Sequence, residues 1–360
     1  MKRALFVIAL LVLIVVGYVL DLLHDAGEFR RVTPVLPGQC TPVYGAPGAE
    51  DISFDPITGM AWISSDDRRA AIDGHPRRGA ILRYDPNSDA RPVDAWPEAP
   101  SDFHPHGLSL YTDDSGRQSL FVINHPGESL FQGRTGSGPA HTIEVFDVVD
   151  DRLVHRATLA DASMISPNDL VAVDHERFYF TNDHGSAPGW RRTLEDYLRR
   201  PWANVVQFDG REFREAAAGL SFANGIQLSR DGETLYVAEV TRNRIREYRR
   251  DPASGALEER RTIDVGFGVD NLELDPASGD LWLGGHLKLL TFTRHAADAS
   301  IDAPSMAARL RLSTEPPELT PVFIDDGSAL SGASVAAVRD GVLLIGSVFE
   351  PHFLVCRSGS

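Results

Sequence analysis

Residues 55–63 read DPITGMAWI, a tight turn followed by a short apolar strand. The Asp-Pro pair and the glycine favour a chain reversal, and the apolar residues after them favour a buried strand. The unit recurs roughly every 45 to 65 residues, and its later strands read LFVI (120–123), FYF (178–180), LYV (235–237), LWL (281–283) and VLLI (342–345). Six copies, each taken as one four-stranded blade, predict an all-β fold, a six-bladed β-propeller. A β-sandwich is the alternative, but it offers no reason for one unit to repeat six times.

The composition excludes some partners. At 360 residues the chain is too long for a small disulfide-stapled module, and its net charge is −16. Phosphate backbones are bound by an excess of Lys and Arg, so we expect no nucleic-acid partner. An acidic surface suits cation binding and plain solubility equally well, and the charge therefore selects no positive function.

The N-terminus carries a membrane signal. Lys2 and Arg3 precede an uncharged, almost wholly apolar run over residues 4–20, which at about 1.5 Å per residue is the short end of a membrane span. A cleaved signal peptide is the alternative, but no clear small-x-small cleavage site follows the run. We predict a signal anchor over residues 1–23, a linker over 24–34 and the propeller over 35–360. The protein would contact the membrane through its N-terminal segment, and the propeller would be exported to the periplasm or the cell exterior.

The only two cysteines are Cys40 and Cys356, near the two ends of the exported part. In an oxidising compartment they could form a disulfide that joins the ends of a circular fold. Two unrelated thiols are the alternative, but the export signal favours the disulfide.

One stretch departs from the β pattern. Residues 193–200 read TLEDYLRR, with a capping residue, an acidic first turn and an apolar stripe, and Pro201 ends them. The pattern predicts a helix in a long connection. Flanked by Trp190 and Trp202, it could lie on a bilayer or cover a pocket, or it could be an ordinary surface helix packed on the blades.

Polar residues interrupt the blades at five places: 50–51, 103–107, 167–169, 222–225 and 269–271. Taken singly, each Asn or Asp is most simply a turn residue. Together they hold similar places in successive units, and loops of a propeller can converge on its central tunnel. Oxygen ligands from Glu, Asp and Asn without cysteine suit Ca²⁺.

These segments resemble the paraoxonase/arylesterase family of six-bladed propeller lactonases, over roughly residues 35 to 356. The matching strings are ED (50–51), AWISS (61–65), PHGLS (105–109), NHP (124–126), NDLVAV (168–173), TNDH (181–184), NGI (224–226), DN (270–271) and LLIGSVF (343–349). The family's end-to-end disulfide and its retained N-terminal hydrophobic segment also have counterparts here.

The resemblance implies two calcium ions in the tunnel. The catalytic ion would be held by Glu50, Asn168, Asn224, Asp270 and Asn271, and the structural ion by Asp51, Asp169 and the backbone carbonyl of Leu108. It also implies His106 as the general base, with His125 behind it, although the carboxylates of Glu50 and Asp270 are rival candidates. His184 and His286 stand where the family places histidines of the substrate pocket wall, though each could equally be a packed loop residue.

The sequence departs from the family near that wall. Animal members carry a free cysteine beside the position of His286, whereas Gly284 and Gly285 precede it here. Lys288 lies in a compact loop, which puts substrate preference in doubt. Asn243 stands where some members have histidine, which weakens any expectation of organophosphate hydrolysis.

We therefore expect a membrane-anchored carboxylic ester hydrolase that acts on lactones, and more slowly on aryl esters, by Ca²⁺-assisted attack of water on the carbonyl. A gluconolactonase-type enzyme for sugar lactones is one alternative. A non-catalytic propeller that uses calcium only for stability and binds a partner is the other.

Overall fold

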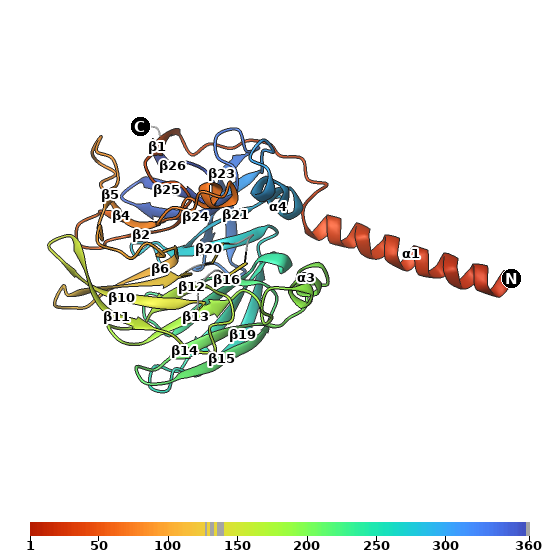
Figure 1. Cartoon of the computed structure of the whole chain (residues 1–360), viewed down its shortest axis with the longest axis horizontal. Helices are drawn as coiled ribbons and strands as arrows, with labels where there is room; N and C mark the ends of the chain where they lie inside the picture. Colours follow the sequence, from red (N-terminus) through yellow and green to blue (C-terminus); the bar gives the residue numbers. More distant parts are fainter. Residues whose placement is uncertain (127, 130–132, 135–139, 358–360) are drawn as a thin grey trace.

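Six four-stranded antiparallel sheets form a ring in the computed structural model of the chain, which describes residues 1–126, 128–129, 133–134 and 140–357 (Figure 1). Each inner strand contacts the inner strand of the next blade, in the order β2, β6, β12, β16, β20, β24 and back to β2. The ring is therefore closed, and the prediction of a six-bladed propeller is confirmed.

The first three blades are built in chain order from the inside outward. Their strands are β2 (Ala49–Phe54), β3 (Ala61–Ser65), β4 (Ala80–Tyr84) and β5 (Val93–Asp94); β6 (Pro105–Thr112), β7 (Gln118–Asn124), β10 (Thr142–Val149) and β11 (Arg152–Leu159); and β12 (Pro167–Ala172), β13 (Phe178–Asn182), β14 (Ala203–Phe208) and β15 (Phe213–Leu220). A separate pair, β8 (Glu128–Ser129) and β9 (Gly133–Arg134), lies in the loop between β7 and β10.

The remaining blades follow the same order. Their strands are β16 (Ala223–Leu228), β17 (Thr234–Glu239), β18 (Arg244–Arg250) and β19 (Leu257–Asp264); β20 (Gly268–Leu274), β21 (Leu281–His286), β22 (Ser305–Arg311) and β23 (Glu318–Asp325); and β24 (Ala333–Arg339), β25 (Val342–Ser347) and β26 (His352–Arg357), completed by β1 (Gln39–Tyr44). The six apolar strands found from the sequence repeat all fall on the second strand of a blade.

The sixth blade joins the two ends of the propeller. β1 pairs antiparallel with β26, and Cys40 lies opposite Cys356 in this register. The two cysteines form a disulfide across a sequence separation of 316 residues, as predicted. In the chain-entropy description, a cross-link over so long a loop stabilises the fold by about 6 kcal/mol.

The hydrophobic core lies between neighbouring blades. Ile63 of the first blade packs in one cluster with Leu344 of the sixth, and Ile245 of the fourth packs in another with Leu283 of the fifth. Each strand therefore buries apolar side chains against the adjacent sheet, while its polar bulges are left to face the tunnel.

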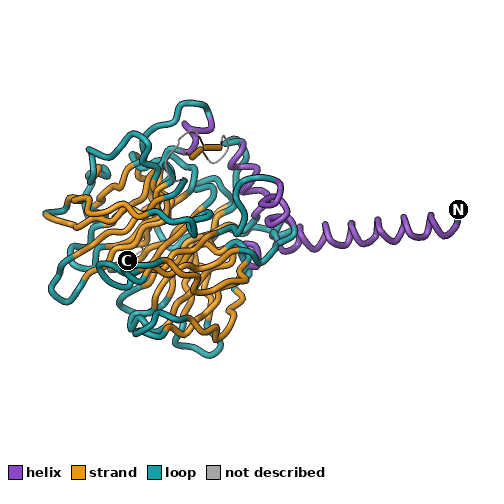
Figure 2. The backbone as a smooth tube through the Cα atoms, turned by 60° about the horizontal axis from the view of Figure 1, so that its bottom comes forward, coloured by secondary structure: helices purple, strands orange, loops and turns teal. Residues whose placement is uncertain are grey.

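The helix α1 (Lys2–Asp25) projects from the propeller in both views (Figure 1, Figure 2). It is apolar and long enough to cross a membrane, and none of its residues is buried. A signal sequence would have the same length and composition. The helix ends two residues beyond the expected segment, and Val35 then exchanges two backbone hydrogen bonds with Ile324.

Two helices lie near the base of α1: α3 (Trp190–Tyr197) and α4 (Leu289–Ala297). The single turn η1 (Val240–Arg242) follows β17, and Asn243 after it donates to the carbonyl of Asp25. The short helix α2 (Arg68–Ile72) follows β3. The α3 helix begins three residues before the predicted start at Thr193. Its apolar residues Leu194 and Tyr197 are 40% and 48% exposed, so they do not form the stripe packed on the blades that an ordinary surface helix would have.

Candidate functional site

Every inner strand carries a bulge at the same place. Pairing with the second strand is interrupted at positions 49–51, 105–108, 167–170, 223–226, 269–272 and 333–336. A bulge re-aims the side chains of its extra residues. The residues within these interruptions include Glu50, His106, Asn168, Asn224, Asp270, Asn271 and Ser334. Backbone irregularity thus brings together polar groups that lie far apart in the sequence.

Two glycines make room for this arrangement. A Cβ at Gly107 would lie 2.7 Å from a carboxylate oxygen of Asp169, and a Cβ at Gly225 would lie 2.5 Å from the carbonyl oxygen of Asp270. No real Cβ tolerates such contacts. The glycines therefore let the neighbouring blade approach closely enough to complete the site.

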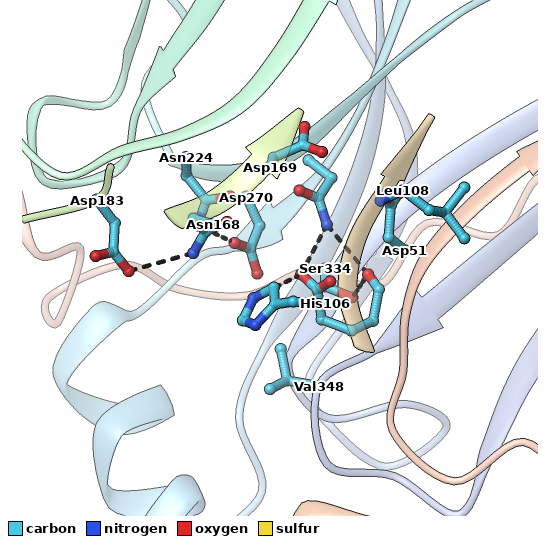
Figure 3. Close-up of polar contacts among 12 residues, drawn as sticks. Asp51, His106, Leu108, Asn168, Asp169, Asp183, Asn224, Asp270, Ser334 and Val348 are labelled. Carbon is cyan, nitrogen blue, oxygen red and sulfur yellow. Dashed lines mark hydrogen bonds and ion pairs between the residues drawn. The ribbon is translucent and has the colours of Figure 1, made fainter. Parts of the chain in front are cut away.

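The carboxamides of the site donate to carboxylates. The Asn271 Nδ2 donates to Glu50 Oε1 at 2.8 Å, the Asn224 Nδ2 donates to Asp270 Oδ1, and the Asn168 Nδ2 donates to Asp183 Oδ2 at 3.3 Å (Figure 3). These bonds fix the orientation of each amide. The amide oxygens are thereby left for another partner.

Four buried oxygens find no hydrogen-bond donor within the described part of the chain: Glu50 Oε2, Asn168 Oδ1, Asn224 Oδ1 and Asn271 Oδ1. Leaving buried acceptors unsatisfied is costly. A hard cation would satisfy all four, and the mixture of one carboxylate with neutral amides is a donor set that Ca²⁺ accepts. Burial, with Asp270 and Asp51 nearby, raises the pKa of Glu50, which a cation would reverse.

A second pair of carboxylates lies deeper in the tunnel. Asp51 accepts hydrogen bonds from the backbone N–H groups of Ile52 at 2.8 Å and Leu108 at 2.7 Å. Asp169 repeats the pattern with Leu170 at 2.7 Å and Ile226 at 2.8 Å. Burial still raises the pKa of Asp51 to about 7, and it raises that of Asp169 as well. The contact between Asp51 and Leu108 runs through the N–H of Leu108, and a ligand role for its carbonyl stays a prediction.

His106 and His125 lie beside the first group of oxygens. His106 Nε2 is 3.6 Å from Glu50 Oε1, and His106 Nδ1 is 3.2 Å from His125 Nε2. His125 Nδ1 in turn is 2.8 Å from His141 Nδ1. Burial and the cation of Arg68 lower the pKa of His106 to about 3, so the imidazole is neutral at physiological pH. The three rings form a chain that could pass a proton away from the site.

A cavity of about 370 Å³ opens above these groups. Glu50, His106, Asn168, Asn224 and Asp270 are among its lining residues, and apolar side chains make up most of its walls, including those of Leu22, Phe222, Leu289, Phe292 and Phe349. A polar floor under apolar walls is suited to a substrate whose reactive carbonyl points down and whose carbon skeleton stays in the cavity.

The two predicted wall histidines have different positions. His286 lines the cavity, its Nε2 lies 3.1 Å from Asp270 Oδ2, and its ring stacks on Phe292 at 3.7 Å. His184 lies behind the wall, where its two nitrogens each contact a carboxylate oxygen, of Asp183 and of Asp196, at 2.7 Å. Although burial lowers it, these carboxylates raise the pKa of His184 to about 10. His184 therefore orients Asp183, which in turn holds Asn168.

Sequence reasoning gave no role to Arg68, Asp183 or Ser334. Ser334 holds the polar position of the sixth blade and donates to the carbonyl of Glu50 at 2.6 Å, so the repeat itself could have found it. Asp183 lies in one of the matching strings. Arg68 lies in the connection after β3, where no periodicity points to it.

Comparison with known proteins identifies the family. The arylesterase family model matches residues 95–357, well over half of the chain. The chain belongs to the arylesterase family. It is 34% identical to mouse serum paraoxonase/arylesterase 1 over 360 residues, which covers 95% of this chain and 97% of the relative. The human protein of that name is 34% identical with 89% coverage of both chains, and rat serum paraoxonase/arylesterase 2 is 33% identical with 84% coverage of both.

Solved structures agree on the fold of this arylesterase-family chain. A putative gluconolactonase superposes with a TM-score of 0.53 at 14% identity, covering 90% of this chain and 94% of that protein. A luciferin-regenerating enzyme gives a TM-score of 0.53 at 12% identity, with coverage of 90% and 95%. At such low identity these matches establish the propeller alone.

Proposed function

We propose that the chain is a calcium-dependent carboxylic ester hydrolase that acts on lactones and, more slowly, on aryl esters. Membership of the arylesterase family and the names of its relatives support ester hydrolysis. The observation that carries the calcium dependence is the set of four buried, unpartnered oxygens on the floor of an apolar cavity.

In this proposal Glu50, Asn168, Asn224, Asp270 and Asn271 hold the catalytic ion, and Asp51, Asp169 and the carbonyl of Leu108 hold a structural one. The catalytic ion, when bound, supplies Lewis-acid polarisation of the substrate carbonyl and stabilises the negative charge that develops on its oxygen. Asp51 and Asp169, the carboxylates proposed for the structural ion, also connect neighbouring blades. Asp51 of β2 accepts from Leu108 of β6, and Asp169 of β12 accepts from Ile226 of β16.

The chain's own residues perform the remaining steps. The apolar walls hold the substrate and exclude bulk water, which strengthens every electrostatic interaction inside. His106, neutral and next to Glu50, accepts a proton from the attacking water, and His125 supports it from behind. The water oxygen bonds to the carbonyl carbon, the ester C–O bond breaks, and the alcohol oxygen takes up a proton. Glu50 and Asp270 are the rival bases.

The two alternative functions receive less support. A sugar lactone carries hydroxyl groups that need polar partners, whereas the surface that this cavity offers to a ligand is mainly apolar. A purely binding propeller gives no reason to place a histidine chain beside the proposed calcium ligands.

We further propose that α1 anchors the protein and that the propeller is exported. The exposed apolar surface of α1 and the disulfide support this placement. In that arrangement the exposed Leu194 and Tyr197 of α3 lie on the side of the molecule that carries the anchor.

The function is tested with the full chain in detergent, because a truncation at residue 23 would remove Leu22, which lines the cavity. Hydrolysis of a medium-chain lactone and of phenyl acetate is measured with Ca²⁺, after chelation, and after Ca²⁺ is restored. We expect turnover to vanish and return. Folded protein that binds Ca²⁺ and hydrolyses neither substrate would contradict the proposal.

A further inference from the structure

Arg68 is a buried cation in the wall of the cavity. It is only 5% exposed, it begins the short helix α2, and it lines the cavity together with His106 and Phe349. The side chain of Asp67 accepts a hydrogen bond from the N–H of Ala70 at 3.0 Å, which fixes the start of this helix. The position of Arg68 is therefore set by local structure rather than by a counter-ion.

The guanidinium has weak partners. Its Nη1 donates to the carbonyl of Val348 at 3.4 Å, and its Nη2 lies 3.5 Å from His106 Nδ1. Among the described residues, no carboxylate oxygen lies within 4.0 Å of it. A guanidinium has five N–H donors in a planar fork that matches a carboxylate. Most of this donor capacity is unused.

Other arginines near the cavity are fully engaged. Arg69, the next residue, donates to the carbonyl groups of His295 and Ala296. Arg199 forms ion pairs with Asp21 and Asp25 of α1. Arg68 is thus distinct from its neighbours.

The other charged groups of the cavity wall each lie close to a group of opposite charge. Asp25 pairs with Arg199, while Asp183 and Asp196 both contact His184. Glu50 and Asp270 together would balance a divalent cation on the cavity floor. Arg68 differs from them, because among the described residues no carboxylate oxygen lies within 4.0 Å of its guanidinium. A buried charge without a close counter-ion is costly unless a ligand supplies one.

We propose that Arg68 forms a carboxylate-binding subsite of the cavity, next to the reacting centre. This inference rests on the proposed ester hydrolysis. Arg68 contacts His106, and His106 in turn contacts Glu50, so Arg68 lies close to the reacting centre. The bound carboxylate therefore belongs either to the substrate molecule whose carbonyl reacts or to the acid that hydrolysis releases. In the first case the enzyme prefers esters and lactones with a free acid group. In the second case Arg68 retains the product.

The first test compares phenyl hexanoate with monophenyl adipate, which has the same chain length and ends in a carboxylate. Both are assayed with the full chain in neutral detergent and Ca²⁺. A hydrogen bond to a charged group is worth about one to two orders of magnitude in affinity. Arg68→Gln is therefore expected to raise KM for the adipate ester about tenfold to a hundredfold and to change KM for the hexanoate ester less than about twofold.

Arg68→Lys keeps the charge without the fork and should retain part of the preference for the acid. Arg69→Gln removes a charge one residue away from the cavity lining, and we expect it to leave the ratio of the two KM values unchanged. If only inhibition by hexanoate is relieved in Arg68→Gln, the carboxylate is that of the product. An unchanged KM ratio together with unchanged product inhibition would overturn the proposal.

A binding measurement separates this proposal from the proposed function. Calorimetric titration, which needs no turnover, compares the binding of hexanoate with that of hexanamide. A bound calcium ion would also attract a carboxylate. A role of Arg68 is therefore shown only if Arg68→Gln loses the preference for hexanoate over hexanamide. We expect the wild-type chain to bind hexanoate at least about tenfold more tightly than hexanamide. A wild-type preference under about twofold would overturn the subsite, even if every variant failed to fold. If the chain shows this Arg68-dependent preference but hydrolyses no ester, the result contradicts the proposed hydrolase function and leaves the carboxylate subsite standing.

Discussion

At the scale of single residues, three asparagines present buried amide oxygens in the tunnel. Each amide donates its N–H to a carboxylate or the backbone, and each amide oxygen stays buried without a donor in the described structure. An alanine at such a position removes the oxygen without changing the charge. The effect on calcium binding can therefore be separated from electrostatics.

Asn224→Ala is expected to weaken calcium affinity at least about tenfold and to lower turnover at limiting Ca²⁺ in the same proportion. The measurement is activity titrated with buffered Ca²⁺. Asn87→Ala, in an exposed turn, is the matched control and should titrate like the wild type. Identical titration curves for the two variants would contradict a ligand role for Asn224.

His106→Gln is expected to lower kcat about a hundredfold with little change in KM, because a general base acts only on the chemical step. His125→Gln should cost less, since His125 contacts His106 rather than the water. His75→Gln, at an exposed position, is the control. If His106→Gln keeps most of its kcat, the base is a carboxylate, Glu50 or Asp270.

His184 should make stability depend on pH. Its pKa is about 10 in the folded protein and about 6.5 in an unfolded chain, so the folded state binds this proton more tightly. The stabilisation is complete below about pH 6.5 and is lost as the pH rises towards 10. We expect His184→Gln to lower the free energy of unfolding by on the order of 2 kcal/mol at pH 6 and by much less at pH 10. A gap in melting temperature that is equal at both pH values, or wider at pH 10, would refute this.

At the scale of elements, α1 is tied to the propeller by polar contacts. Tyr18 donates its hydroxyl to the carbonyl of Tyr197 at 2.6 Å, and Asn243 donates to the carbonyl of Asp25 at 2.8 Å. Arg199, after α3, pairs with Asp21 at 2.5 Å and also with Asp25. These contacts hold Leu22 and Ala26 in the cavity wall, so the end of α1 is part of the site.

Releasing this connection should change substrate binding more than chemistry. Arg199→Gln is expected to raise KM for a medium-chain lactone several-fold, about three- to tenfold, with kcat nearly unchanged. Limited proteolysis between residues 26 and 34 should also become faster. Arg200→Gln, exposed and outside any described ion pair, is the control. A fall in kcat at constant KM would show that Arg199 acts elsewhere.

A different contact accompanies the earlier start of α3. The sequence offers Thr193 as a capping residue, but Thr193 lies inside the helix, and its hydroxyl is 3.5 Å from the carbonyl of Gly189. The start is set by tertiary structure, where the buried Glu195 accepts from the N–H of Gly185 at 2.7 Å. Local capping signals do not record such a contact with the preceding loop.

For the whole molecule, the sequence predicted the architecture better than the site. The turn-and-strand repeat is local, so it predicted six blades directly. Which side chains face the tunnel depends on the six bulges, and a bulge disturbs the alternation that periodicity relies on. The polar segments around Glu50, Asn168 and Asn224 were found from the sequence pattern, but their assignment to individual ions came from family resemblance. Arg68, which has no repeat position, was not found at all.

The closed ring of blades is held at its junction by strand pairing and by a disulfide. Six blades are joined through one blade whose outer strand comes from the N-terminal end, so unfolding can begin where β1 leaves β26. The Cys40–Cys356 disulfide constrains that step across 316 residues. Replacing both cysteines with alanine should lower the free energy of unfolding by about 3 to 5 kcal/mol, because the pairing of β1 with β26 remains and only the cross-link is lost.

Activity at 25 °C should persist in this double variant, since the tunnel residues lie on inner strands. Thermal unfolding of the double variant is compared with that of the reduced wild type, which should melt at the same temperature. A double variant as stable as the oxidised wild type would mean that strand pairing alone closes the ring.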